Sequence, residues 1–256
     1  MQHLAVVSLR YPVRVDLEAW VLPEGKVPQS TTHQMTVYRL YGLLTAWAEH
    51  CRDERSLRIA ADLPVRWLQE HPRTGADPDV CVFEPAPPDF DDLKSFKLWE
   101  PGRVPPRLAI EVVSTSFPHK DYGRIQERYA AMGVEELVVF DPLLCGPRSL
   151  GGPVALQLWR RDATQAFERV QFGSEPVHSA VLDAWLIASD RDLDIANDRQ
   201  GKQRWLTAEE RLPLAQAEAE RAQAEAERAQ AEAERERQAR QDIEQRLREL
   251  EARLPR

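Results

Sequence analysis

Two acidic residues occupy positions where apolar strands are expected. Glu111 interrupts the run Leu-Ala-Ile-Glu-Val-Val at 108–113, which is otherwise typical of a buried central strand. A buried carboxylate is costly unless it is paired, hydrogen-bonded or bound to a metal ion. Asp79 directly precedes another apolar run, 80–83, and could supply a second acid if the two strands are neighbours. This pair is the first candidate for chemistry.

Two neighbouring carboxylates are a donor set for a hard divalent cation. Mg²⁺ prefers oxygen ligands and keeps several waters, so Asp79, Glu111 and one backbone carbonyl, which we assign to Val112, would suffice. Mn²⁺ suits the same oxygen ligands. Such an ion can activate water and neutralise charge on a scissile phosphate. The residues leave a second interpretation open, in which Glu111 pairs with Arg107 or Arg128 or faces solvent at a sheet edge.

The composition is that of a globular protein with an acidic balance. The chain has 256 residues and a net charge of −8, which argues against a protein that coats nucleic acid non-specifically. The acidic balance does not exclude a nuclease, because its metal site needs carboxylates and local basic patches can still hold phosphates. The sequence has no apolar run of the length that crosses a bilayer and no basic leader at its start. We therefore expect a cytoplasmic protein without a membrane partner.

Residues 1–205 are predicted to form a mixed α/β domain. An amphipathic pattern predicts a helix over 33–52, with candidate caps at 30–32. The stretch 57–68 is typical of extended structure, and 80–83 of a short strand. Proline, aspartate and lysine dominate 85–106, which indicates a loop.

The second half of this domain alternates strands with a helix. The run 108–113 predicts a buried strand, and 121–132 predicts a helix that ends at Gly133, where a C-terminal cap belongs. A further buried strand is expected at 137–140. The segments 154–160 and 167–172 are expected to form an outer hairpin.

Residues 206–256 are predicted to form a separate long helix. The heptapeptide Ala-Gln-Ala-Glu-Ala-Glu-Arg occurs three times in succession over 215–235, and its residues are strong helix formers. A seam started at Ala215 and Ala219 continues at alternating spacings of three and four, and it ends on four aliphatic residues within 243–254. This pattern predicts a coiled coil that joins a second copy or a partner protein. A solvated single helix with Glu–Arg pairs is the alternative.

The acidic pair belongs to a longer pattern that resembles a known family. Pro-Asp-Val at 78–80, Ala-Ile-Glu-Val-Val-Ser-Thr-Ser at 109–116 and the stretch from Asp121 to Pro142 are similar to the Uma-two family of endonucleases in the PD-(D/E)XK superfamily. Weaker similarity extends to His33 and to 179–186. The resemblance implies a restriction-endonuclease-like fold, in which a mixed sheet is flanked by helices.

Carried over to this chain, the resemblance makes Asp79 and Glu111 the metal-binding acids. The superfamily's lysine stands two residues after the glutamate, at Val113 here, and the family's displaced lysine corresponds to Ile125. Neither lysine is present. The usual task of that lysine is to polarise the attacking water and stabilise the phosphate, so its loss bears directly on activity.

Three nearby basic residues could replace the missing lysine: Lys120, Arg124 and Arg128. Arginine stays charged, which makes it a poor proton-transfer group, but it can clamp a phosphate. Surface salt bridges are the alternative role for the two arginines.

Contacts with nucleic acid are expected from His33, Gln126 and Tyr129. Gln126 and Tyr129 resemble the Gln–Tyr helix motif of some nucleases in the superfamily, and His33 begins the helix that flanks the cleft in the resemblance. The alternatives are a core position for Tyr129, and helix capping or solvent exposure for His33.

Taken together, these features predict a Mg²⁺-dependent endonuclease that acts on nucleic acid, with DNA as the favoured substrate. A second hypothesis is a nuclease fold that has lost catalysis and serves in nucleic-acid binding or assembly through its coiled coil. A third is a structural coiled-coil adaptor with an α/β head, for which the two acids would lie too far apart to share an ion.

Overall fold

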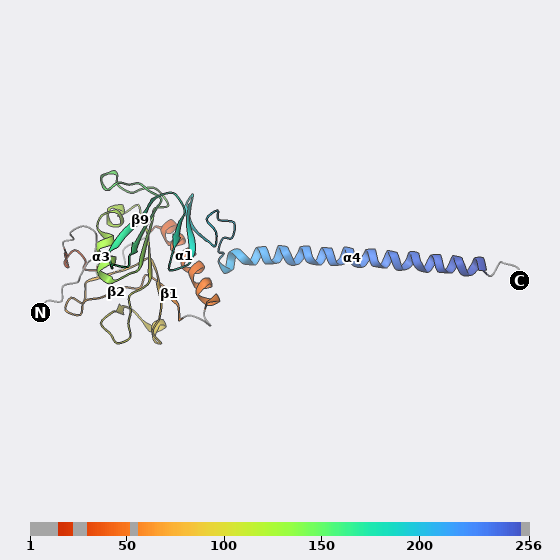
Figure 1. The fold of residues 1–256 in the computed structure, drawn as a ribbon, viewed down its shortest axis with the longest axis horizontal. Coiled ribbons are helices and arrows are strands. Elements are labelled where there is room, and N and C mark those ends of the chain that lie inside the picture. The colour runs from red at the N-terminus through yellow and green to blue at the C-terminus, as the bar shows by residue number, and fades with distance from the viewer. Residues whose placement is uncertain (1–14, 23–29, 52–55, 252–256) are drawn as a thin grey trace. The chain divides into compact units, whose positions relative to one another are not determined.

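The computed structural model describes residues 15–22, 30–51 and 56–251. The chain divides into two compact units, Met1–Thr207 and Ala208–Arg256. The first unit contains a mixed sheet and its covering layers, and the second is one long helix (Figure 1). The predicted mixed α/β fold with a flanked sheet is confirmed.

A six-stranded mixed sheet forms the centre of the first unit, in the order β1-β4-β6-β7-β8-β9. Its only parallel pair is β6–β7, and every other neighbouring pair is antiparallel. The strands are β1 (Arg58–Ala61), β4 (Val80–Phe83), β6 (Leu108–Val112), β7 (Glu136–Phe140), β8 (Leu156–Arg161) and β9 (Phe167–Gly173).

The middle strands match the apolar runs of the sequence. Every residue of β4, β6 and β7 is buried, as expected for strands covered on both faces. The predicted strands at 80–83, 108–113 and 137–140 are therefore confirmed. The predicted hairpin is also confirmed, since β8 and β9 pair at one edge of the sheet.

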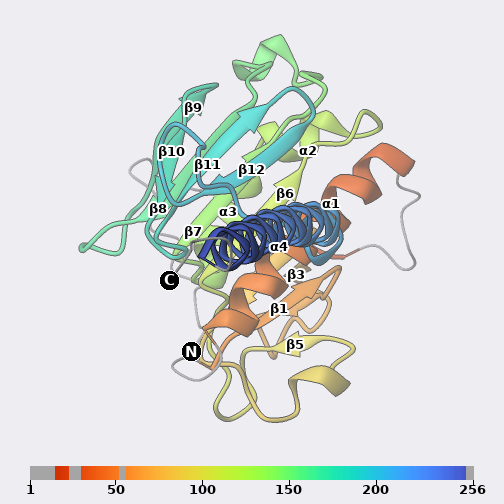
Figure 2. The same cartoon turned by 90° about the vertical axis from the view of Figure 1, so that its right-hand side faces the viewer.

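Helix α1 (Thr31–His50) covers one face of the central sheet, together with a second sheet (Figure 2). Ser30 caps α1 by accepting a hydrogen bond from the His33 backbone N–H. The second sheet, β10 (Val177–Ser179), β11 (Ala184–Ser189) and β12 (Asp192–Ala196), was not predicted. β10 has three residues and β12 contains two aspartates, which makes these strands hard to distinguish from loops, whereas β11 is a mostly apolar run of six residues that the sequence analysis did not assign.

The opposite face is covered by helix α3 (Ile125–Met132) and a small third sheet. Gly133 has a φ of 96°, so it supplies the left-handed cap that ends α3 as predicted. The small sheet consists of β2 (Val65–Arg66), β3 (Gly75–Ala76) and β5 (Phe96–Lys97). The predicted loop at 85–106 contains β5 and a short 3₁₀ helix, η1 (Phe90–Asp92); a second, η2 (Arg148–Leu150), follows β7.

Two sequence-based segment boundaries were wrong. The helix predicted over 121–132 is two helices, because Pro118 starts α2 (Pro118–Tyr122) early and the backbone leaves helical geometry at Gly123, where ψ is −97°. The extended stretch 57–68 is also divided. Asp62 has a φ of 52°, which turns the chain between β1 and β2 and places these strands in different sheets.

The second unit consists of helix α4 (Ala208–Glu251), which spans 44 residues and contains Pro213 in its second turn. Within the residues that the structure describes, no helix has both the length and the apolar character needed to cross a membrane.

Candidate metal centre

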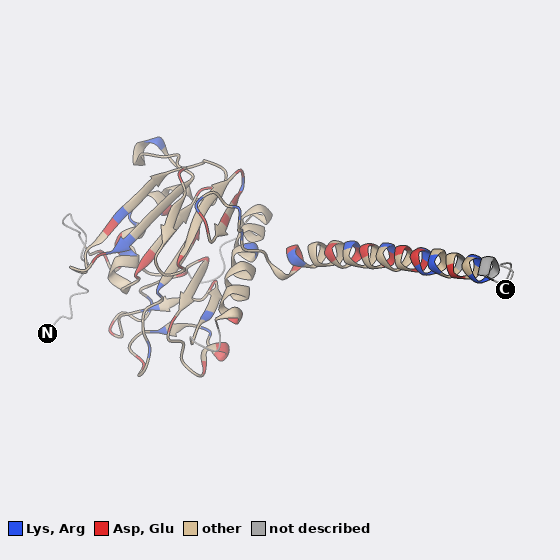
Figure 3. Cartoon of the chain, turned by 45° about the vertical axis from the view of Figure 1, so that its right-hand side comes forward, with Lys and Arg blue, Asp and Glu red and all other residues tan. Residues whose placement is uncertain are grey.

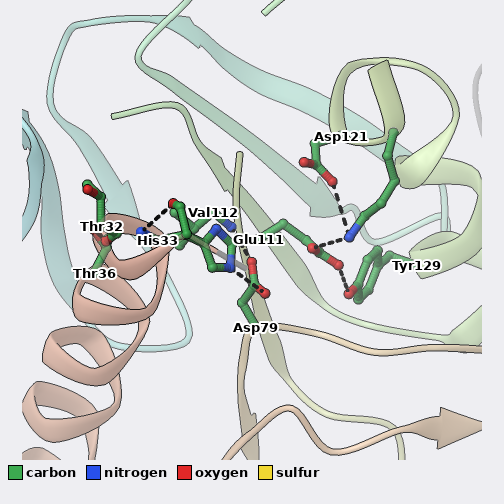
Figure 4. A network of polar contacts seen from close by, with 10 residues as sticks. Thr32, His33, Thr36, Asp79, Glu111, Val112, Asp121 and Tyr129 are labelled. Carbon is green, nitrogen blue, oxygen red and sulfur yellow. Dashed lines mark hydrogen bonds and ion pairs between the residues drawn. The ribbon is translucent and has the colours of Figure 1, made fainter. Parts of the chain in front are cut away.

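The register of the central sheet brings the two acids together. Val80 of β4 pairs with Ile110 of the antiparallel strand β6. Extending this register by one residue places Asp79 opposite Glu111. Their side chains are buried, with residue exposures of 4% and 1%. The condition that the two strands are neighbours is therefore met, and this end of the sheet holds two carboxylates side by side (Figure 4).

Asp79 is held by donors from two different elements. Its Oδ2 accepts a hydrogen bond of 2.7 Å from the Val112 backbone N–H, beyond the last backbone pair of β4 with β6. Its Oδ1 lies 3.2 Å from Nε2 of His33, in the first turn of α1. Asp79 thus ties the end of β6 to α1.

Glu111 is held from the opposite layer of the domain. The Tyr129 hydroxyl on α3 donates a short hydrogen bond to Oε1, and the Lys120 ammonium on α2 donates to Oε2 at 3.2 Å. Burial raises the pKa of Glu111, the charge of Lys120 opposes that shift, and the charge of Asp79 adds to it. The charge of Asp79 therefore acts directly on the Glu111 carboxyl.

Lys120 is the cation of the site. Its side chain is 52% exposed, although its ammonium also lies 3.5 Å from Oδ1 of Asp121. The charge of Glu111 raises the pKa of Lys120, so the ammonium stays protonated. Lys120 therefore links a buried acid to the solvent side of the site.

Asp121 is a third acid that the sequence did not single out. It is buried, and its Oδ1 has no hydrogen-bond partner in the described part of the chain, only the ion pair with Lys120. Burial raises its pKa well above the ordinary value. In the sequence, Asp121 looks like an ordinary polar residue near the start of a helix. Its burial within α2, which only the structure shows, is what marks it as part of the site.

The two expected lysine positions are part of the core. Val113 and Ile125 are buried, with exposures of 1% and 5%, and both pack in the cluster on the α3 side of the sheet. Of the three proposed replacements, Lys120 contacts Glu111 directly. Arg124 instead pairs with Glu127 at 2.5 Å, and Arg128 donates to the Ala19 backbone carbonyl at 2.9 Å.

The interpretation in which Glu111 pairs with an arginine is wrong. The donors to Glu111 are Tyr129 and Lys120, while Arg107 binds Glu84 and Glu135. Solvent exposure at a sheet edge is excluded as well, because β6 is an interior strand.

The three residues expected to contact nucleic acid all lie inside the domain. His33, Gln126 and Tyr129 have exposures of 6%, 8% and 0%. Tyr129 is a core residue, as one alternative held, and the exposed position considered for His33 is wrong. Burial lowers the pKa of His33, but the hydrogen bond and charge of Asp79 outweigh burial, so the net shift is upward. Gln126 donates to the Gly123 carbonyl at 3.2 Å, across the break between α2 and α3.

The donor set fits a cation that keeps much of its own hydration. Among the described residues, no group of three or more histidine, cysteine, aspartate or glutamate side chains is arranged to hold a metal ion. The ligands that the sequence predicted are fewer than that: the carboxylates of Asp79 and Glu111, and the backbone carbonyl of Val112, which follows Glu111 in β6. Mg²⁺ accepts so few protein ligands, and its charge would relieve the repulsion between the acids.

The mixed sheet and its covering layers have the architecture of the restriction-endonuclease-like class. The chain belongs to the Uma2 family, described as "Putative restriction endonuclease", whose model matches residues 15–184. One similar solved structure is that of "a putative nuclease belonging to DUF820" from Anabaena variabilis ATCC 29413. It has 14% sequence identity and a TM-score of 0.41, over 61% of this chain and 76% of that chain. No curated protein matches the chain.

Proposed function

We propose that the protein is a Mg²⁺-dependent endonuclease that cleaves DNA, with Mn²⁺ able to replace Mg²⁺. The observation that carries this proposal is the contact between Lys120 and Glu111, beside Asp79, in a chain without a lysine at either expected position. Membership of the Uma2 family supports the nuclease class. The metal and the choice of DNA are inferred from the site.

Asp79 and Glu111 would hold the ion with their carboxylates, and the Val112 carbonyl would complete the protein ligands. When bound, the ion supplies charge neutralisation at the phosphate and activation of water. The role of the surrounding protein is to hold the carboxylates in place. His33 and Tyr129 do so through one hydrogen bond each, so we assign them positioning roles rather than direct contacts with DNA.

Lys120 would supply the positive charge that the missing lysine usually provides. Its side chain is half exposed, so its ammonium can reach a phosphate oxygen without leaving the vicinity of Glu111. Its raised pKa keeps it a hydrogen-bond donor at neutral pH. A fixed cation at this point stabilises the negative charge that develops on the phosphate during hydrolysis. Arg124 and Arg128 would be peripheral phosphate contacts at most.

A catalytically impaired nucleic-acid-binding module is the second candidate. One observation favours it: the four carboxylate oxygens of Asp79 and Glu111 each have a hydrogen-bond partner within the protein. The acid pair is thus satisfied without an ion, and an ion would have to share these oxygens with their present donors through the remaining lone pairs.

A plasmid-nicking assay separates the two candidates. The unchanged protein should nick supercoiled plasmid in Mg²⁺ or Mn²⁺, and E111A should abolish nicking. K120M should lower the rate by roughly 100-fold or more, the usual loss on removing one charge-stabilising donor. K97M is the matched control, because Lys97 is similarly exposed, at 45%, and pairs with a glutamate outside the site. No nicking by the unchanged protein with either ion would favour the impaired module.

We also propose that α4 joins the protein to another chain, either a second copy or a different protein. Its heptad pattern and its exposed aliphatic residues support this role.

A further inference from the structure

Helix α4 exposes a regular apolar seam. Every described side chain from Arg211 to Arg248 is exposed, including Leu212, Ile243 and Leu247 at 60%, 58% and 54%. In heptad terms, Leu212, Ile243 and Leu247 all fall on the seam positions called a and d. The alanines of the repeat fill the seam between them: Ala215, Ala219, Ala222, Ala226, Ala229 and Ala233. Large aliphatic side chains at these positions are normally covered by another helix.

Alanines alone would not select a partner. Acidic and basic residues occur along the whole described length of α4 (Figure 3), and those beside the seam decide which partner fits. The flanking positions g and e of two parallel helices face each other five residues apart. At these facing positions, Glu218 and Glu225 of one helix each meet a glutamine of the other. Glu232 meets Arg237, and Ala239 meets Glu244. A second copy in the same register therefore meets no like charge from Glu218 to Glu244, and it meets an opposite charge at Glu232.

We propose that two copies of α4 form a parallel, in-register, two-stranded coiled coil. The seam itself contains one charged step, with Glu236 at a d position and Arg240 at the next a position. In the parallel arrangement a d residue packs beside the following a and e residues of the other helix. Glu236 would lie beside the partner's Arg240 and the partner's Arg237. In this register Glu236 and Arg240 also each lie beside their own copy, and the contacts between opposite charges offset these two like-charge contacts. A shift by one heptad would instead bury the charges against Ala229, Ala233, Ile243 and Leu247, so the step favours the in-register alignment.

An antiparallel pair fits less well. The antiparallel alignment that sets Glu236 against Arg240 avoids the like-charge contacts within the seam, but it faces Arg237 with its own copy. It further places Ile243 and Leu247 against Ala233 and Ala229, so the largest side chains no longer meet one another. A single solvated helix would leave these aliphatic residues exposed to water.

The parallel arrangement also affects the candidate metal centre, and this step rests on the proposed nuclease function. Both chains enter the coiled coil at its N-terminal end, so the two α/β units attach at the same end. One assembly would then carry two acid pairs, one for each strand of a duplex.

Light scattering on the full chain tests the dimer. We expect a mass of twice the chain mass of 29.3 kDa. The double variant I243D/L247D should be monomeric, whereas A224D, which places the same charge on the outer face of α4, should remain dimeric. A monomeric unchanged protein, or a dimer that survives I243D/L247D, would overturn the proposal. Neither result depends on metal binding or cleavage, so failure of this proposal is distinct from failure of the nuclease function.

Disulfide trapping tests the orientation. A229C places a thiol at a d position, where parallel in-register helices bring equivalent residues together, and A231C places one on the outer face. Under mild oxidation we expect a covalent dimer from A229C, and only the background of the unchanged protein from A231C. Equal trapping of both variants, or a dimer in which A229C is not trapped, would exclude the parallel register.

Charge reversal tests the polar step. E236R alone should weaken the dimer by roughly tenfold or more, and E236R/R240E should restore it to within about threefold, because residues in one charge network are not additive. A double variant as weak as E236R would show that the two residues do not contact each other across the seam.

Discussion

His33 lies 46 residues before Asp79 in the sequence, yet its Nε2 is 3.2 Å from the Asp79 carboxylate. Asp79 needs this partner because its side chain is buried and its other oxygen is already bound to the Val112 N–H. Carboxylates that bind metal ions are normally fixed by such outer partners, and loss of a partner typically weakens metal affinity about 10–100-fold.

We therefore predict that H33L weakens Mn²⁺ binding by about 10–100-fold in calorimetric titrations. H33Q should bind within a few-fold of the unchanged protein, because the glutamine amide can donate in place of Nε2. If H33Q restores Mn²⁺ binding and H33L does not, the His33 side chain acts by holding Asp79 through a hydrogen bond and not only by filling space.

H178L is the matched control. His178 also pairs with an aspartate, Asp183, at 3.3 Å, but it is 40% exposed and lies outside the site. Its loss should leave Mn²⁺ affinity unchanged. Equal weakening in H33L and H178L, or equal affinity in H33L and the unchanged protein, would remove His33 from the site.

Tyr129 supplies the second prediction at this scale. Its hydroxyl is the buried donor to Glu111, and hydrogen bonds to charged groups contribute about 1.5–3 kcal/mol. Y129F should lower the free energy of unfolding in urea by about that amount. Y38F should change it by less than about 0.5 kcal/mol, because Tyr38 is 66% exposed. Equal stability of Y129F and Y38F would show that the contact with Glu111 contributes little.

Among the secondary-structure elements, α2 determines where Lys120 lies. This helix has five residues and is anchored through Tyr122, whose hydroxyl lies 2.9 Å from Asp141 Oδ2 and accepts from the Val154 N–H at 2.9 Å. Gly146 and Gly152 pack directly against the Tyr122 ring. The loop after β7 therefore supports the helix that carries the cation.

We predict that G146A lowers the free energy of unfolding by about 1–3 kcal/mol, the usual result of overpacking. A Cβ at Gly146 would overlap the Tyr122 ring and displace α2. G173A is the control, since the nearest atom to a Cβ there is a flexible glutamine side chain at 3.6 Å. If urea denaturation gives the same stability for both variants, the loop does not hold α2 as described.

The sequence predicted the helices and strands better than it predicted the tertiary contacts between them. The apolar runs that became β4, β6 and β7 were evident, because central strands are buried on both faces. The break at Gly123 was missed because local composition does not determine it, and the sheet β10–β12 was missed although β11 is a mostly apolar run of six residues. The acid pair was identified from the cost of burying Glu111. Its partners His33, Lys120 and Tyr129 come from three helices, and only the tertiary packing brings them together.

For the molecule as a whole, the division into two units predicts separable roles. Every residue of the candidate site lies within Met1–Thr207. A chain that ends at Thr207 should therefore fold and bind Mn²⁺ with the affinity of the full protein, while losing the ability to dimerise. Circular dichroism, calorimetry and light scattering check the three properties. Loss of Mn²⁺ binding in a folded truncated chain would show that α4 contributes to the site.

The central proposal is that Asp79 and Glu111 share one divalent ion. Calorimetric titration of Mn²⁺ into the full protein, D79N and E111Q tests it most directly. Each substitution keeps the size of the side chain and removes a charge. We predict one bound ion per chain in the unchanged protein and at least a tenfold loss of affinity in each variant, as expected for loss of a charged ligand. Unchanged affinity in either variant, or no binding by the unchanged protein, would contradict the shared site.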